Sequence, residues 1–338
     1  MKLYNVAIVG ATGAVGTELL KGLAERDFPV GKLRLFADPS EKGKKIVFRG
    51  EEFTVEACAP GCFKGTDIAL FAAGSQRELA KEAAASGAVV IDNSSAFRMD
   101  PDVPLIVPEV NPEDVSWHKG IIANPNCSTI QMVVALKPLH DEAKIRRIIV
   151  STYQAVSGAG LAGLNALENE VKEHIETGKD PKDLTPSAFP YPIAFNCIPH
   201  IDVFLENDYT KEEMKMVNET RKMFHDDTIA INATAVRVPV FRSHSESVTI
   251  ETERPLTPER AKELFAKAPG VILVDDPAEK KYPMAIHSSG TNEVYVGRIR
   301  RDISLPDDRG LSLWVVADQI RKGAATNALQ IAELLTKN

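Results

Sequence analysis

Residues 3–25 read LYNVAIVGATGAVGTELLKGLAE, and this stretch decides the fold class. An apolar run typical of a buried strand leads into Gly10, Gly13 and Gly16, and the pattern from 17 to 24 predicts a helix. Glycines permit a tight turn, while the N–H groups and dipole of a helix N-terminus attract a pyrophosphate. The spacing is GxxGxxG rather than GxGxxG, so these residues alone also fit a plain strand-to-helix turn.

The first 125 residues continue this alternation of strand-like and helix-like segments. The later segments are KLRLFAD (32–38), DIALFAAG (67–74), RELAKEAAASG (77–87) and AVVIDNSS (88–95). Strands separated by helices indicate parallel pairing. We therefore predict an α/β fold that begins with a Rossmann-like, doubly wound dinucleotide-binding domain.

Asp38 ends the second strand-like segment, near the position where an acidic side chain receives the ribose hydroxyls of NAD. Such a carboxylate would repel the 2′-phosphate of NADP. Lys42, Lys44 and Lys45 follow closely and could neutralise that phosphate. The choice between NAD and NADP therefore stays open on charge alone.

A second domain, of α+β type, is expected after Pro125. We predict a helix at 128–139, a strand at 147–152, a glycine-rich turn at 157–163 and a charged helix at 168–176. The proline-rich stretch DLTPSAFPYPIAFNCIPHID (183–202) predicts a long loop or intersubunit arm, because proline removes backbone donors. Further strands are predicted at 233–241 and 246–253, with helices at 258–268 and near the C-terminus.

The segment Asn124-Pro-Asn-Cys127-Ser-Thr129 places a cysteine at a predicted helix start. Asn126 is a favoured N-cap residue, so Cys127 falls in the first turn. A helix N-terminus favours the thiolate, which is the nucleophilic form, and its N–H groups can hold an oxyanion. A thioester mechanism also needs a base, and His244, which follows a predicted strand among Arg237, Arg242 and Glu246, is the leading candidate.

Composition narrows the function classes. The 338 residues carry a formal net charge of -7, so no general field draws the chain to nucleic acid, and no apolar stretch approaches the roughly 20 residues of a membrane span. Four irregularly spaced cysteines make no disulfide framework, and we expect a cytoplasmic protein with reduced thiols. Cys58 and Cys62 have no second ligand pair at suitable spacing, so no metal site is predicted.

Seven motifs together resemble the aspartate-β-semialdehyde dehydrogenase family, over nearly the whole chain. They are GATGAVG (10–16), DNSSAFRM (92–99), NPNCST (124–129), TYQAVSGAG (152–160), IPHID (198–202), RVPVFRSHSE (237–246) and NALQIAELL (327–335). The resemblance implies an NADP-binding domain at 1–126 with 318–338, and a catalytic and dimerisation domain at 127–317. It also implies a homodimer or homotetramer that reduces L-aspartyl-4-phosphate to L-aspartate 4-semialdehyde, releasing phosphate, in the biosynthesis of lysine, threonine, methionine and diaminopimelate.

The resemblance also implies residue roles. Cys127 is the acyl-thioester nucleophile, His244 the general acid/base, and Gln154 orients the substrate. Arg237 is assigned to the substrate's α-carboxylate. Glu212, with Glu213 as the alternative, is assigned to its ammonium. The phosphate is assigned to Arg98, Lys215 and Asn93. The cofactor residues are Gly10, Thr12, Gly13, Ala14, Val15, Asp38, Ser157, Gly158 and Gln319.

The chain departs from the family pattern after its second strand. Family members commonly carry a serine and then an arginine there for the 2′-phosphate, whereas this chain has Asp38-Pro-Ser-Glu41. We expect NADP first, with NAD use left open. The alternative functions are an N-acetyl-γ-glutamyl-phosphate reductase and a non-catalytic nucleotide-binding protein on the same fold.

Overall fold

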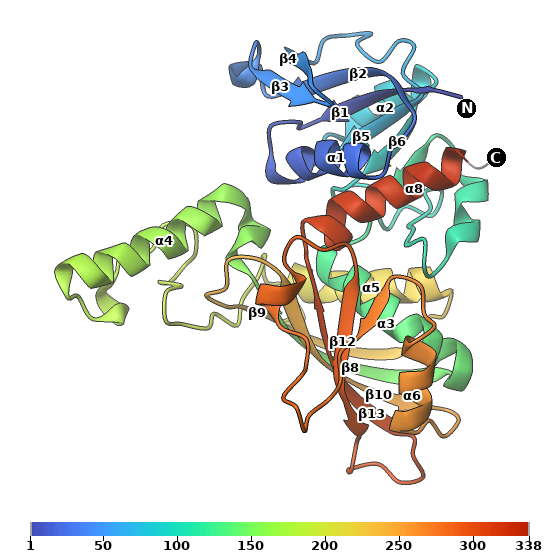
Figure 1. Ribbon diagram of the computed structural model, residues 1–338, viewed down its shortest axis with the longest axis vertical. Coiled ribbons are helices and arrows are strands. Elements are labelled where there is room, and N and C mark those ends of the chain that lie inside the picture. Colours follow the sequence, from blue (N-terminus) through green and yellow to red (C-terminus); the bar gives the residue numbers. More distant parts are fainter. Residues whose placement is uncertain (1, 337–338) are drawn as a thin grey trace. The chain divides into compact units, whose positions relative to one another are not determined.

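The computed structural model describes residues 2–336, which form two compact units (Figure 1). The first unit holds the described residues 2–126 and 323–336, and the second runs from Cys127 to Lys322. The two-domain α/β architecture predicted from the sequence is confirmed. The domain boundaries at 126, 317 and 318 stay a prediction.

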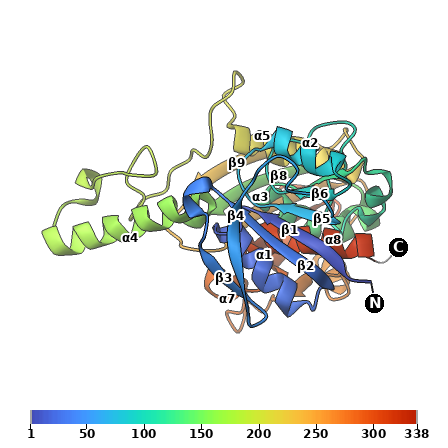
Figure 2. The same cartoon turned by 90° about the horizontal axis from the view of Figure 1, so that it is seen from above.

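The first unit is built on a seven-stranded sheet in the order β3-β4-β2-β1-β5-β6-β7 (Figure 2). Its strands are β1 (Tyr4–Val9), β2 (Val30–Ala37), β3 (Lys45–Phe48), β4 (Glu51–Ala57), β5 (Ile68–Phe71), β6 (Val89–Asp92) and β7 (Ile121–Ala123). Every neighbouring pair is parallel except β3 with β4. The β3–β4 hairpin was not foreseen, because its strands carry several charged residues, although Phe53, Val55 and Ala57 alternate along β4.

Three α-helices pack on this sheet. They are α1 (Ala14–Glu25), α2 (Arg77–Ala85) and α8 (Thr326–Thr336). The short turn η1 (Pro39–Glu41) lies between β2 and β3, and η2 (Pro112–Trp117) lies between β6 and β7. The helix α8 lies beside α1, as Figure 1 shows, and its Leu329 and Ile331 enter the core formed by β1 and α1. Arg26, the C-cap residue of α1, forms an ion pair with Glu333 of α8 at 2.6 Å.

A ladder of asparagine amides ties α8 to the sheet. Asn327 Nδ2 donates to Asn124 Oδ1 at 2.7 Å and to the Ile106 carbonyl at 2.9 Å. Asn124 Nδ2 in turn donates to Asn93 Oδ1 at 3.0 Å. Since all three residues are buried or half-buried, these bonds satisfy polar groups that water does not freely reach.

The second unit is built on a six-stranded sheet in the order β11-β12-β13-β10-β8-β9. Its strands are β8 (Ile145–Gln154), β9 (Ala230–Arg237), β10 (His244–Thr252), β11 (Val271–Leu273), β12 (Val294–Arg301) and β13 (Gly310–Ala317). β10 runs antiparallel to both β8 and β13, whereas β8 and β9 are parallel. This mixed sheet agrees with the α+β expectation.

Helices cover one face of this second sheet. They are α3 (Cys127–Ala143), α5 (Lys211–Phe224) and α6 (Pro258–Phe265). The short α7 (Ala285–Ser288) lies near β13, and its Ala285 helps to line a hollow on the opposite face. Side chains of β8 and β10 that face α3 are fully buried, whereas Ile149 and Tyr153 on the opposite face of β8 are 39% and 38% exposed. One face of the sheet is therefore core, and the other is available to a partner.

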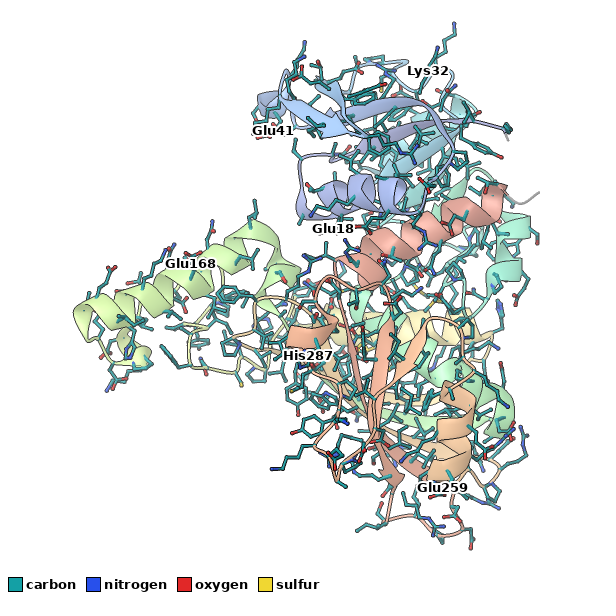
Figure 3. All side chains as sticks on the ribbon, viewed as in Figure 1. Glu18, Lys32, Glu41, Glu168, Glu259 and His287 are labelled. Carbon is teal, nitrogen blue, oxygen red and sulfur yellow. The ribbon has the colours of Figure 1, made fainter. Side chains whose placement is uncertain are left out.

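A long excursion leaves the second sheet after β8. The turn η3 (Val156–Ala159) leads into α4 (Gly160–Thr177), which projects from the sheet in Figure 1 and is followed by a mostly irregular segment containing η4 (Pro181–Asp183). The predicted turn at 157–163 was wrong in its second half, because Gly160 already begins α4. Glu168, labelled in Figure 3, lies on the exposed side of α4 and pairs with Lys172. The irregular course of 184–202 confirms the predicted loop.

Within residues 2–336, no helix combines the length and the apolar character that a membrane span requires.

Candidate active site

The glycine loop joins β1 to α1 in the first unit. Gly10 has a φ of +87°, and a Cβ there would lie 2.8 Å from Ala73 N. A Cβ on Gly16 would lie 2.1 Å from Gly10 O, so a side chain at either position would collide with backbone. These two glycines permit the tight turn that the sequence predicted.

The start of α1 has the features of an anion site. Gly13 is its N-cap and supplies no side-chain cap, and the first turn of α1 holds no acidic residue. The first N–H groups of a helix have no intrahelical partner and carry the positive end of its dipole. Thr12, Ala14 and Val15 lie in this segment, so its backbone fits a pyrophosphate.

Asp38 lies directly after β2 and is exposed. Its carboxylate accepts from Ser40 N at 3.0 Å and Ser40 Oγ at 2.7 Å, and these bonds lower its pKa. Asp38 is therefore anionic at neutral pH. Two of the lysines that could neutralise a phosphate nearby are already paired, Lys44 with Glu41 and Lys45 with Glu52.

Arg98 and Asn93 are the candidates in the first unit for binding phosphate, and both are held by hydrogen bonds to backbone carbonyls. Arg98 is buried and donates from Nε to the Asn124 carbonyl at 2.9 Å and from Nη2 to the Asn93 carbonyl at 2.8 Å. Asn93 Nδ2 donates to the Phe71 carbonyl at 2.9 Å. These bonds hold the cation at the carboxyl ends of β5 and β6, where open α/β sheets bind ligands.

Cys127 is the first residue of α3, as the sequence predicted, and is half-buried. Burial lowers the pKa of Arg237, and the charges of Glu212 and Cys127 oppose this without cancelling it. The thiol of Cys127 is therefore close enough to the guanidinium of Arg237 to interact with it electrostatically. Cys58 differs, because burial and the neighbouring Cys62 raise the pKa of its thiol to about 12. Cys127 therefore remains our candidate for the nucleophile.

Strand register assembles the other catalytic candidates of the second unit. Gln154 of β8 lies opposite Arg237 of β9, and the β8–β10 register that pairs Ser245 with Tyr153 puts His244 beside Gln154. We call Arg237, Gln154 and His244 the catalytic row. All three are at least 94% buried on the face that α3 covers.

His244 has one ring nitrogen bonded and one without a described partner. The Ala155 N–H donates to Nδ1 at 3.0 Å, whereas Nε2 has no hydrogen-bond partner within residues 2–336. Because a backbone N–H can only donate, the neutral ring carries its proton on Nε2. Burial, and next the charge of Arg237, lower the pKa of His244 well below its ordinary value.

Arg237 is held by the segment that follows β8. Its Nη1 donates to the Ala155 carbonyl at 2.7 Å, and its guanidinium lies over the Phe189 ring. A Cβ on Gly158 would lie 2.8 Å from Arg237 Nη1 and 3.5 Å from His244 Nε2. Gly158 therefore lets Arg237 and His244 approach the backbone of η3 closely.

Glu212 and Glu213 on α5 have separate tasks. Glu213 forms a capping box with Thr210 and also accepts from Ala235 N at 2.9 Å, so it fastens α5 to β9. Glu212 instead accepts from Gln154 Nε2 at 3.3 Å, beside the catalytic row. Of the two, Glu212 is the one that can meet a substrate.

Lys215 lies one turn after Glu212 and binds it. Its Nζ lies 2.9 Å from both Glu212 Oε2 and Asp202 Oδ2. Burial acts to lower the pKa of Lys215, but Glu212 and Asp202 outweigh burial and raise it. Sequence reasoning missed Asp202 as a partner, although it ends the quoted IPHID motif.

Ser157 and Gln319, two of the cofactor candidates, are bonded to each other in the second unit. Gln319 Nε2 donates to Ser157 Oγ, and Gln319 Oε1 accepts from Ser243 N at 2.8 Å. Gln319 thus joins the turn η3 to the residue before His244. Any contact that Gln319 makes to a cofactor comes in addition to this bridge.

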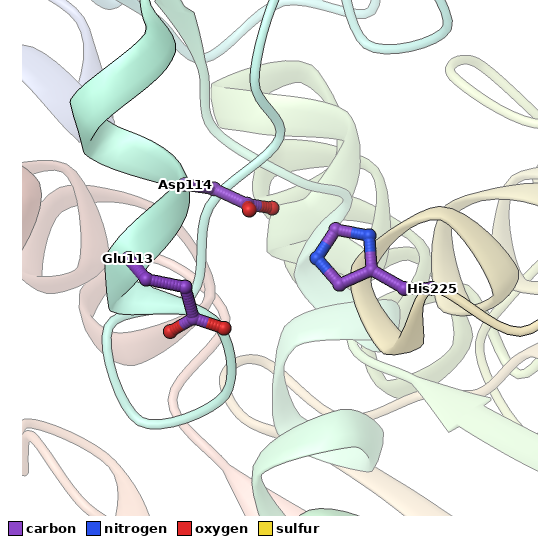
Figure 4. A group of neighbouring side chains, drawn as sticks. All are labelled: Glu113, Asp114 and His225. Carbon is purple, nitrogen blue, oxygen red and sulfur yellow. The ribbon is translucent and has the colours of Figure 1, made fainter.

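Glu113, Asp114 and His225 are drawn together in Figure 4. Glu113 and Asp114 belong to the first unit, and His225 ends α5 in the second. Asp114 accepts from Asn111 Nδ2 at 2.7 Å and Trp117 Nε1 at 3.2 Å inside its own unit. We assign no metal site to these residues, because Asp114 has a structural role and the set spans both units.

A dinucleotide-type glycine loop, together with a helix-start cysteine and a row of imidazole, amide and guanidinium, indicates a class of protein. That class is the nicotinamide-dependent oxidoreductases with a cysteine nucleophile. Residues 5–118 match the family model described as semialdehyde dehydrogenase, NAD binding domain. Residues 136–322 match the model described as semialdehyde dehydrogenase, dimerisation domain.

Individual relatives narrow the class. The chain is 59% identical to the aspartate-semialdehyde dehydrogenase of Aquifex aeolicus, over 99% of this chain and 98% of that protein, and 53% identical to that of Campylobacter jejuni, over 98% and 97%. The crystal structure of aspartate semialdehyde dehydrogenase II from Vibrio cholerae, complexed with ASA, superposes with a TM-score of 0.94 at 48% identity, covering 100% of this chain and 99% of that one. The chain belongs to the aspartate-semialdehyde dehydrogenase family.

Family membership confirms the resemblance read from the motifs. The chain is an oxidoreductase of amino-acid biosynthesis, and its first unit is a nicotinamide dinucleotide-binding domain. These relatives favour this function over the N-acetyl-γ-glutamyl-phosphate alternative.

Proposed function

We propose that the chain catalyses the NADPH-dependent reduction of L-aspartyl-4-phosphate to L-aspartate 4-semialdehyde, with release of phosphate. The observation that carries this proposal is the catalytic row, Arg237, Gln154 and His244, on the sheet face covered by the helix that Cys127 begins. Glu212 beside Gln154 suits a substrate with a free ammonium better than an N-acetylated one.

Cys127 acts as the nucleophile. Its thiolate attacks the acyl-phosphate carbonyl, the C–O bond to phosphate breaks, and an acyl thioester remains on the sulfur. Arg237 binds the substrate α-carboxylate with a planar fork of donors, while Gln154 orients the acyl group. Lys215, Arg98 and Asn93 are the groups that receive phosphate.

His244 acts as the general acid/base. Its Nε2–H donates a hydrogen bond to the former carbonyl oxygen and stabilises the negative charge that develops there. Proton transfer at this nitrogen passes through the imidazolium form, in which Nε2 gives its proton to the oxygen and takes it back in the oxidative direction. Its lowered pKa keeps the ring neutral at physiological pH. A neutral imidazole does not repel the neighbouring Arg237.

The residues present fit a dinucleotide. The Gly10–Gly16 turn and the uncapped start of α1 suit the pyrophosphate, with Thr12, Ala14 and Val15 in the same loop, and Ser157, Gly158 and Gln319 are proposed for the nicotinamide end. The bound cofactor supplies the hydride. We place NADP before NAD because of the family, although the anionic Asp38 favours ribose hydroxyls over a 2′-phosphate.

We propose a homodimer or homotetramer that works in the cytoplasm, where the four free cysteines stay reduced. The sheet face opposite α3 carries the half-exposed Tyr153 and a hollow of about 480 Å³ lined in part by Tyr282, Met284 and Trp314. The hollow also carries Arg298 and Arg300, and a face that combines aromatic and arginine side chains suits a second copy of the chain. Light scattering after size exclusion gives the number of subunits.

Absorbance at 340 nm tests the reaction. Aspartate semialdehyde is supplied with NADP or NAD, each with and without inorganic phosphate. Phosphate-dependent reduction of the dinucleotide is the expected result. If only the N-acetylated glutamate analogue reacts, the substrate assignment is wrong, and if neither reacts, a non-catalytic nucleotide-binding protein is favoured.

A further inference from the structure

A second row of side chains crosses the sheet directly below the catalytic row. Glu246 follows His244 by two residues on β10, and Thr152 precedes Gln154 by two on β8, so both point to the face that α3 covers. The strand register places Glu246 and Thr152 opposite each other. The next pair below them, Val248 and Val150, is apolar.

Glu246 is fully buried, and within residues 2–336 neither of its carboxyl oxygens has a hydrogen-bond partner at ordinary geometry. Two further buried polar atoms beside it share this condition, Thr152 Oγ1 and Gln131 Oε1. Gln131 comes from α3, four residues after Cys127 and thus on the same helix face. Its Nε2 donates to the His244 carbonyl at 3.4 Å, which places Gln131 over β10.

A proton on the Glu246 carboxyl group would allow hydrogen bonds among the carboxyl oxygens, Gln131 Oε1 and Thr152 Oγ1. Burial raises the pKa of Glu246 well above its ordinary value, and the nearby side-chain amide of Gln131 opposes that rise without cancelling it. A neutral carboxylic acid at this position would supply one O–H donor to a group of buried atoms that otherwise have no described partner. That O–H suits Gln131 Oε1, and the Thr152 hydroxyl can donate to the other oxygen.

We propose that Glu246 is a positioning residue for the reaction: its carboxyl group bridges Gln131 and Thr152 and thereby holds Cys127 in register with His244 and Gln154. The inference rests on the proposed roles of Cys127 and His244. Glu246 itself touches no substrate, because it lies one row below the catalytic side chains. Its effect is transmitted through α3 on one side and through β8 and β10 on the other.

The reaction is sensitive to such a register. A nucleophile and a proton donor must reach the same carbonyl group, and a misplacement of about 1 Å costs on the order of 10²-fold in rate. A packed apolar contact between α3 and β10 would tolerate sliding, whereas a hydrogen-bonded pair has one geometry. A buried acid at this position is thus explained by alignment rather than by core packing.

Two variants of Glu246 separate alignment from packing. Glu246→Gln keeps the shape, the neutral charge and one donor for Gln131, so we expect kcat within about threefold of wild type. Glu246→Leu keeps the volume but leaves Gln131 Oε1 unpaired, so we expect kcat to fall about tenfold or more while KM changes less than about threefold. Val248→Ala, one row further from the catalytic row, is the control, with a lower Tm and an unchanged kcat.

A partner swap covers the case in which the leucine variant does not fold. Gln131→Glu alone sets two acids side by side, whereas Gln131→Glu with Glu246→Gln restores one acid and one amide. We expect the double variant to recover the kcat that the single variant loses. No recovery, an unaffected kcat in Glu246→Leu, or equal losses in Glu246→Leu and Glu246→Gln would each overturn the proposal.

The alkylation of Cys127 by iodoacetamide keeps this test separate from the test of the reaction. The modified peptide is followed by mass spectrometry in wild type, Glu246→Gln and Glu246→Leu. We expect the leucine variant to differ from the other two in its rate of modification. If wild type is alkylated at Cys127 but reduces no dinucleotide, the proposed function is refuted. The effect of Glu246 on the position of Cys127 can then still be measured from the alkylation rates.

Discussion

The glycine loop of the first unit and the catalytic row of the second are built in different ways. The loop, Gly10 to Gly16, is a backbone site made by one continuous segment, and two of its glycines have no room for a Cβ. The row takes one side chain from each of three strands and depends on their register. The loop should therefore fail when a side chain is added at Gly10 or Gly16, and the row should fail when a particular functional group is removed.

The largest effect is expected at the nucleophile. Cys127→Ala should lower kcat by about 10⁴-fold or more, because no other group can form the thioester. Dinucleotide affinity, measured by fluorescence titration, should stay the same, since the glycine loop is untouched. A near-normal rate of NADPH oxidation in this variant would rule out the covalent mechanism.

Arg237 should govern substrate affinity. Arg237→Leu should raise KM for aspartate semialdehyde and lower kcat/KM by about 10²-fold, because a carboxylate loses its bidentate partner. Arg260→Leu removes an exposed arginine of the same unit and serves as the control. Equal KM values in the two variants would exclude Arg237 from carboxylate binding.

The loop can be broken by a single methyl group. Gly16→Ala should weaken dinucleotide binding by at least about tenfold, because its Cβ would lie 2.1 Å from Gly10 O. A Cβ on Gly13 would lie 3.5 Å from that oxygen, an ordinary contact, so Gly13→Ala should have the smaller effect. Isothermal calorimetry with NADP compares them, and the reverse order would contradict this reading of the loop.

Asp38 should set the preference between cofactors. Asp38→Ser removes the charge that faces a 2′-phosphate, and we expect the ratio of kcat/KM for NADP over NAD to rise about tenfold. The wild-type ratio is the reference for both cofactors. An unchanged ratio would place the ribose away from Asp38.

The smallest effect concerns pH. His244 has a lowered pKa in the folded state, so the unfolded chain takes up the proton first as pH falls. Stability should then drop below about pH 6.5, by up to about 1.4 kcal/mol per pH unit. His244→Asn lacks this loss, and urea unfolding of both proteins at pH 7.5 and 5.5 measures it. If the difference in unfolding free energy between the two proteins is the same at both pH values, His244 has the same pKa in the folded and unfolded states.

Much of this structure could be predicted from continuous sequence motifs. The strand, glycines and helix of 3–25 lie together in the chain, so periodicity and turn chemistry were enough to predict them, as they were for Cys127 at the start of α3. The β3–β4 hairpin was missed and the start of α4 was misplaced. In both places the local residues are compatible with more than one backbone path.

The catalytic row shows where local patterns stop. The motifs nominated Gln154, Arg237 and His244 one at a time, but hydrogen-bonding between β8, β9 and β10 puts them side by side. The sequence favoured Glu212 and left Glu213 as the alternative, and the packing of α5 separates them, with Glu213 facing β9 and Glu212 facing Gln154. Glu246 appeared only as a nearby charge, because its burial depends on α3 covering the sheet. Register, side-chain direction and burial are set by contacts between distant segments, whereas a glycine turn and a helix start are set by neighbours in the chain.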